Sequence, residues 1–171
     1  DRERFFRIPL GGRPLGLRIS RDDRRAYIAN YLDNRVQVVD LTERKVARTF
    51  FLGGPAQPSL ARRGEAIFYD GRRSLDQWYS CHSCHYEGGT NNVAMDTLND
   101  GSNLTFKTVP PLFHLPATAP WTWHGWQKDL TAAMNKSLTE TMLGPQPNAE
   151  DSAALIEYFR NLQPPPNPYR Q

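Results

Sequence analysis

The chain of 171 residues is long enough for one ordinary domain, or for a small domain with an extension. Its hydrophobic fraction of 39% supports a core, but no segment approaches the roughly 20 consecutive apolar residues of a membrane-spanning helix. The formal net charge of +3 comes from arginines scattered among acidic residues, which is typical of a solvated surface and argues against a nucleic-acid-binding stripe.

The first third of the chain contains a repeat. The triplet Leu-Gly-Gly begins at Leu10 and again at Leu52, a period of 42 residues. Alternating segments separated by polar turns predict strands at 15–19, 25–31, 36–40 and 46–51. A period in the forties that is made of short strands is typical of a β-propeller blade, and any other antiparallel meander is the alternative.

The segment RRAYIANYLDNRVQVVDLTERKVARTFFLGG resembles a blade of the YVTN-type β-propellers, and the similarity covers about residues 5–54. One blade and a fraction cannot close a ring, because repeat units bury their faces against neighbours. We therefore expect residues 1–57 to form a short antiparallel β-sheet, blade-like and part of a longer propeller, with any ligand site of a propeller channel lying outside this chain.

After residue 57 the pattern changes from strands to helices. A first helix is predicted to begin after Ser59, which can cap it, and two more are predicted at about 127–142 and at about 149–162, the last capped by Asn148. Residues 71–120 are predicted to be irregular, and so long a loop in a compact domain indicates that a large group organises it. The predicted fold class is α+β, with a mainly helical domain at 58–171.

Both cysteines lie in the stretch WYSCHSCHYEGG, residues 78–89. A structural zinc site needs four ligands and the chain has no second cysteine pair, while a thioredoxin-like redox pair needs a βαβ setting; both remain open as alternatives. Cys81-His82-Ser83-Cys84-His85 is the C-x-x-C-H motif that attaches c-type haem. It predicts one covalent haem c, bound through Cys81 and Cys84, with His85 as a ligand of the iron.

The residues around this motif resemble the bacterial di-haem cytochrome c peroxidase family. The stretches RRGEAIFYDGRRSLDQWYSCHSCHYEGG (62–89) and TVPPLFHLPATAPWTWHGWQKDLTAAM (108–134) are similar to two parts of that family, and ALIEYFRNL (154–162) resembles its closing helix. The chain departs from the family in having a single haem motif, and in having His124-Gly125-Trp126 where the family tends to have Asp-Gly-Arg. The resemblance implies the fold and the haem, and the departures put the peroxidase activity in doubt.

The second iron ligand is expected to be Met142. It stands at the end of a predicted helix, and the stretch Glu-Thr-Met resembles the one that carries a methionine ligand of the electron-entry haem in the peroxidase family. Met134 lies in mid-helix, where a core position is expected, and Met95 follows His85 so closely that it would have to wrap tightly around the porphyrin. A histidine ligand or an open position are the remaining alternatives.

The aromatic run WTWHGW is expected to line the haem pocket. Its three tryptophans are Trp121, Trp123 and Trp126. Aromatic area can bury a large flat porphyrin and an indole N–H can reach a propionate, while a role in electron hopping is the alternative. His114 and His124 are expected to pack or to donate hydrogen bonds rather than to bind iron, and His82 is expected to face solvent.

Two classes of function follow from these features. The first is a mono-haem electron-transfer domain that serves a redox partner protein or domain, with the rest of a β-propeller as a further partner. The second is a peroxidase-like haem enzyme with an open iron site, or with a second redox centre elsewhere. The sixth iron ligand discriminates them, because a protein sulfur closes the iron and raises its potential. The resemblance also implies a periplasmic or otherwise extracytoplasmic location.

Overall fold

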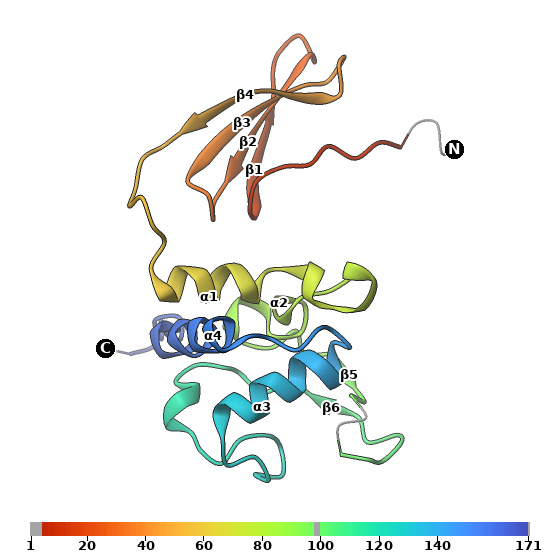
Figure 1. Cartoon of the computed structure of the whole chain (residues 1–171), viewed down its shortest axis with the longest axis vertical. Coiled ribbons are helices and arrows are strands. Elements are labelled where there is room, and N and C mark those ends of the chain that lie inside the picture. The colour runs from red at the N-terminus through yellow and green to blue at the C-terminus, as the bar shows by residue number, and fades with distance from the viewer. Residues whose placement is uncertain (1–4, 98–99, 171) are drawn as a thin grey trace. The chain divides into compact units, whose positions relative to one another are not determined.

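The computed structural model describes residues 5–97 and 100–170, and the chain divides into two compact units, residues 1–57 and 58–171 (Figure 1). The first unit is a sheet and the second is mainly helical, so the fold is mixed α+β, as predicted. No helix among the described residues combines the length and the apolar character that crossing a membrane requires.

The first unit is a four-stranded antiparallel sheet in which neighbours in sequence are neighbours in space, in the order β1-β2-β3-β4. Its strands are β1 (Pro14–Ile19), β2 (Arg25–Asn30), β3 (Arg35–Asp40) and β4 (Lys45–Phe51). β2 alternates strictly between exposed and buried residues, and Ala26 and Ile28 form a small core with Val39 of β3. The two outer strands are far more exposed: Leu17 of β1 is 67% exposed and Phe51 of β4 is 70% exposed.

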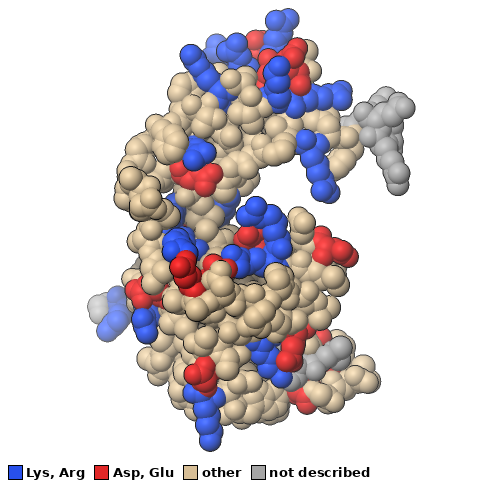
Figure 2. All heavy atoms as spheres, viewed as in Figure 1, with Lys and Arg blue, Asp and Glu red and all other residues tan. Residues whose placement is uncertain are grey.

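The charges of the chain are mixed on its surface. Figure 2 shows Lys and Arg side chains interspersed with Asp and Glu over the visible face of each unit, and pairs such as Lys45 and Glu43, 3.2 Å apart, account for part of this pattern. Both signs therefore alternate on that face, which agrees with a solvated surface rather than a basic stripe.

The second unit is built around the packing of α1 against α4. Its helices are α1 (Leu60–Phe68), α2 (Cys81–Cys84), α3 (Leu130–Lys136) and α4 (Ala149–Asn161). Ser59 caps α1 by accepting from the backbone N–H of Arg62, and Asn148 caps α4 by accepting from that of Asp151. The shared core consists of Ile67, Phe68, Leu112, Met134, Leu138, Met142, Ala154, Leu155 and Phe159.

α1 and α4 approach each other closely because α1 carries a glycine at the contact. A Cβ placed on Gly64 would lie 1.9 Å from the carbonyl oxygen of Ala154 and 2.8 Å from the Cβ of Tyr158. Only a residue without a side chain fits there, and the close approach brings Phe68 and Leu155 together with no exposed area.

Residues 71–120 are more regular than expected, and the prediction of an unstructured loop is wrong in part. Besides α2, this stretch holds the two-residue strands β5 (Ala94–Met95) and β6 (Lys107–Thr108), which pair antiparallel. It also holds 3₁₀ turns at Gly71–Arg73, Leu75–Gln77, Tyr86–Gly88 and Leu115–Ala117. Elements this short have no hydrophobic period, so the sequence pattern does not reveal them.

The helix predicted at 127–142 begins later and ends near Met142 as expected, but its last turn is π-helical. Asp129 accepts from the backbone N–H of Ala132 and so caps α3, which starts at Leu130. α3 then continues as a π-helical turn, η6 (Ser137–Thr141), whose C-terminal neighbour is Met142.

Candidate functional site

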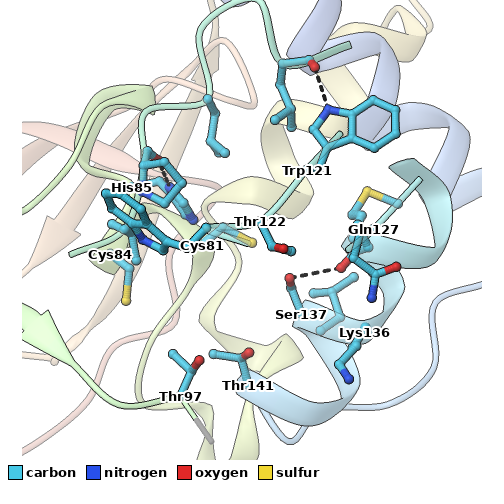
Figure 3. A pocket seen from close by; sticks show the side chains of 18 of the residues that line it. Cys81, Cys84, His85, Thr97, Trp121, Thr122, Gln127, Lys136, Ser137 and Thr141 are labelled. Carbon is cyan, nitrogen blue, oxygen red and sulfur yellow. Dashed lines mark hydrogen bonds between the residues drawn. The ribbon is translucent and has the colours of Figure 1, made fainter. Parts of the chain in front are cut away.

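Every residue that the sequence analysis assigned to a cofactor lines one cavity of the second unit. The cavity has a volume of about 270 Å³, and its walls include both cysteines, His85, Met142 and the three tryptophans of the run 121–126. In Figure 3 the cysteines and His85 lie on one side of this space, and Gln127 and Lys136 lie on the other. Most of the wall is apolar, which suits a large flat group with few charges.

The two cysteines are presented by the single turn of α2. Ser80 precedes this turn, and its backbone N–H donates to the hydroxyl of Ser83 at 3.0 Å, forming half of a capping box. Residues three positions apart lie on the same side of a helix, so Cys81 and Cys84 both reach the cavity. Both thiols are free.

Burial raises the pKa of the Cys81 thiol to about 12, and it raises the pKa of Cys84 as well. In the part of the chain that the structure describes, no three His, Cys, Asp or Glu side chains come together as a metal site. Among the described residues, Cys81 and Cys84 therefore have no further ligands around them for the zinc alternative.

His85 follows the last residue of α2, and its backbone N–H donates to the carbonyl of Cys81 at 2.9 Å. Its ring nitrogen Nδ1 lies 3.0 Å from the carbonyl oxygen of Pro110. A carbonyl only accepts, so Nδ1 carries the proton and Nε2 keeps its lone pair. Burial lowers the pKa of this imidazole, outweighing its hydrogen bonds to Pro110 and Gly89, and so favours the neutral form that binds a metal.

All three methionines line the cavity. The Met142 sulfur is 3.8 Å from Cys81 Sγ, and the Met95 sulfur is 3.7 Å from Cys84 Sγ. Met142 is 5% exposed and Met134, in α3, is 8% exposed. The sequence analysis gave Met95 little weight, yet the pairing of β5 with β6 brings it to the wall.

The tryptophans use their indole N–H groups within the protein. Trp121 donates to the carbonyl of Leu115 at 2.8 Å, and Trp123 donates to that of Thr108 at 2.7 Å. Trp126 is 44% exposed, and its ring lies 4.9 Å from the ring of His124. Trp121 and Trp123 therefore contribute ring area to the pocket, while their N–H groups are occupied by backbone carbonyls.

Of the remaining histidines, His124 lines the cavity, whereas His114 and His82 do not. His114 is exposed, with a left-handed backbone conformation before a 3₁₀ turn, and His124 packs on Trp126. His82 does not simply face solvent, and that expectation is wrong in part. Its ring is 23% exposed, lies 4.7 Å from the ring of Tyr69, and has Nε2 3.0 Å from a carboxylate oxygen of Glu87.

The sequence analysis missed the polar part of the wall. Lys107 and Lys136 line the cavity, where Lys107 pairs with Asp100 at 2.5 Å and Lys136 with Glu140 at 3.0 Å. These cations could hold carboxylates of a bound cofactor. The hydroxyl residues Thr97, Thr122, Ser137 and Thr141 also line the cavity (Figure 3). Single lysines and threonines spread along a sequence do not indicate a binding site, because only the folded contacts bring them together.

The comparisons with known proteins agree with this geometry. Residues 58–165 match the family described as di-haem cytochrome c peroxidase, so the match covers more than half of the chain. The structure is also similar to one titled Kuenenia stuttgartiensis hydrazine synthase pressurized with 20 bar xenon, with a TM-score of 0.58 and 23% identity. That alignment covers 69% of this chain and only 41% of the other, so it shows a shared fold alone. No curated protein matches the chain.

Proposed function

The chain belongs to the di-haem cytochrome c peroxidase family, and we propose that residues 58–171 form a mono-haem cytochrome domain that transfers electrons. The family's cofactor is haem c, which supplies an iron that gains or loses one electron. Cys81 and Cys84 would attach it, and His85 would provide one ligand of the iron. The fold that goes with this function is a blade-like sheet followed by a mainly helical cytochrome domain.

The observation that carries the proposal is the position of the Met142 thioether. It is buried, it lines the cavity, and its sulfur is 3.8 Å from the sulfur of one anchoring cysteine. Together with His85, this thioether would close the iron to outside ligands and raise its potential. Both effects favour electron transfer over reaction with peroxide.

The departure at 124–126 supports the same conclusion. Where the family tends to have Asp-Gly-Arg, the side chains here are an imidazole and an indole that stack on each other. A stacked pair of rings offers neither the carboxylate nor the guanidinium of the family pattern. A peroxidase-like enzyme with an open iron, or with a second redox centre elsewhere, is the alternative.

The sheet of residues 1–57 is proposed to be one blade of a longer propeller. Support comes from the 42-residue repeat, from the meander order of its strands, and from the apolar side chains left exposed on β1 and β4. If the full-length gene product contains no further copies of this 42-residue repeat, the proposal is wrong.

We also propose that the domain exchanges electrons with a redox partner protein or domain and that it lies outside the cytoplasm, in the periplasm. Haem-loaded protein found in the cytoplasm of fractionated cells would contradict this location.

The test replaces each methionine by leucine in the haem-loaded protein, because leucine keeps the volume and removes the sulfur. Met142→Leu is expected to abolish the weak far-red sulfur-to-iron absorption band and to let the ferrous protein bind carbon monoxide at once. Met95→Leu and Met134→Leu are the matched controls and should keep the band. Prompt carbon monoxide binding by the unmodified protein would favour the enzyme alternative, and extraction of all haem by acidified acetone would exclude covalent attachment.

A further inference from the structure

The segment just before the haem-attachment motif is tied directly to the segment that carries Met142. The backbone N–H of Leu75 donates to the carbonyl oxygen of Met142 at 2.9 Å. The hydroxyl of Tyr79 donates to the carbonyl oxygen of the preceding residue, Thr141. We propose that these two donors form a clamp, with Tyr79 as a positioning residue, that holds the Met142 thioether toward the iron; this rests on Met142 being the ligand.

The clamp acts where the helix cannot hold the methionine alone. Met142 follows the π turn η6, and its backbone N–H donates to the carbonyl of Ser137, five residues earlier, at 3.0 Å. The extra residue of a π turn changes the direction of the side chain that follows by about 100° relative to an uninterrupted α-helix. The carbonyls of Thr141 and Met142 then lie at the end of the helix, where intrahelical donors run out. Tyr79 and Leu75 supply the donors.

The backbone between the two donors contains two residues in the left-handed conformation. Asp76 and Gln77 have φ angles of 54° and 59°, left-handed values that are unfavourable for residues with side chains. These two residues lie between Leu75 and Tyr79, whose donors reach the neighbouring carbonyls of Met142 and Thr141.

A third contact fixes the other side of Met142. A Cβ on Gly144 would lie 1.9 Å from the carbonyl oxygen of Arg73, so the segment after Met142 lies directly against the same loop. Arg73 is itself held by an ion pair with Asp151 of α4 at 2.7 Å. The loop is thus anchored to the core helix and can hold Met142 in place.

Tyr79 also links the two sides of the cofactor site. It stands two residues before Cys81, lines the cavity, and packs against the core of the second unit. The hydrogen bond to Thr141 therefore joins the segment that attaches the haem to the segment that provides the second ligand.

The test measures how readily an external ligand displaces the methionine in the haem-loaded full chain. The probe is imidazole, titrated into the ferric protein while the far-red band is followed. Tyr79→Phe removes only the hydroxyl, and one hydrogen bond is worth a factor of about five in a local equilibrium. We expect imidazole to bind about fivefold more tightly to Tyr79→Phe. The control is Tyr169→Phe, because Tyr169 is 90% exposed and lies outside the cavity wall; it should not change the affinity.

A second variant tests the other donor. Leu75→Pro removes the N–H that bonds Met142, at the first position of a 3₁₀ turn and after an extended Ser74, where proline fits. Leu75→Ala keeps the N–H and loses the side chain, so it is the matched control. Imidazole affinity should rise about fivefold in Leu75→Pro and stay unchanged in Leu75→Ala.

The outcomes separate the clamp from the ligand assignment. If Tyr79→Phe and Leu75→Pro lower the thermal unfolding midpoint but leave the imidazole affinity unchanged, the contacts are merely structural and the clamp is refuted. If Met142→Leu keeps the far-red band, the ligand assignment fails and the clamp fails with it. If Tyr79→Phe does not load haem, the comparison of Leu75→Pro with Leu75→Ala decides the matter alone.

Discussion

Replacing Gly64 by alanine tests the packing on which the second unit rests. The new Cβ would lie 1.9 Å from the carbonyl oxygen and 2.5 Å from the carbonyl carbon of Ala154, whereas ordinary contact begins near 3.4 Å. Both atoms belong to the backbone of α4 and cannot swing away. The two helices must therefore separate by about 1.5 Å at this point.

The expected cost follows from two opposing effects. Overpacking a close-packed interface costs about 1–3 kcal/mol, and this contact falls at the upper end because no side chain can yield. Alanine is favoured over glycine in a helix by about 1 kcal/mol, which offsets part of that cost. We expect Gly64→Ala to lower the free energy of unfolding by about 2 kcal/mol.

The assay is denaturant unfolding of the haem-loaded protein, followed by far-ultraviolet circular dichroism. Gly71→Ala is the matched control, because a Cβ there would meet its nearest neighbour, the carbonyl oxygen of Gln77, at an ordinary 3.4 Å. That control should be neutral or stabilising by up to about 1 kcal/mol, through the smaller entropy of the unfolded chain. Equal stability of Gly64→Ala and Gly71→Ala would refute the reasoning.

Two further predictions concern the sheet and the cavity wall. Deleting residues 1–53 should leave the haem absorption spectrum unchanged, because every candidate iron ligand lies in the second unit; a changed spectrum in the truncated protein would contradict this. Hydrogen bonds from Lys107 and then Ser102 hold the pKa of Asp100 below its usual range, so their stabilising effect is present above about pH 4 and is lost as the pH falls. Unfolding midpoints at pH 7 and pH 3 should therefore differ less in Asp100→Asn than in the unmodified protein, and an equal pH dependence of the two would count against the prediction.

The parts of the fold that could be predicted are those encoded by neighbours in sequence. Ser59 and Asn148 were predicted as N-caps, and each accepts a hydrogen bond from a backbone N–H three residues later. The four strands follow from alternation and polar turns. The helix end near Met142 was predicted from Gly144 and Pro145, but the π-helical form of its last turn was not, because one inserted residue in a single turn leaves no pattern that the sequence alone reveals.

The candidate site divides in the same way. Cys81, Cys84 and His85 lie within five residues, and their spacing alone predicts a shared role. By contrast, the tautomer of His85 depends on the carbonyl of Pro110, 25 residues away. Met95 reaches the wall through a strand pair of two residues, which carries no period. Contacts of this kind appear only once the chain is folded.

The approach of both Met142 and Met95 to the cysteines means that proximity alone does not select the iron ligand. The two differ in how their segments are held. Met142 is 5% exposed within the core, and the backbone around it accepts hydrogen bonds from Leu75 and Tyr79. Met95 lies in a two-residue strand whose other member, Ala94, is exposed. A ligand that must stay on the iron through each change of charge needs a fixed backbone, because every loosely held residue loses ordering entropy when it binds. We favour Met142 for this reason.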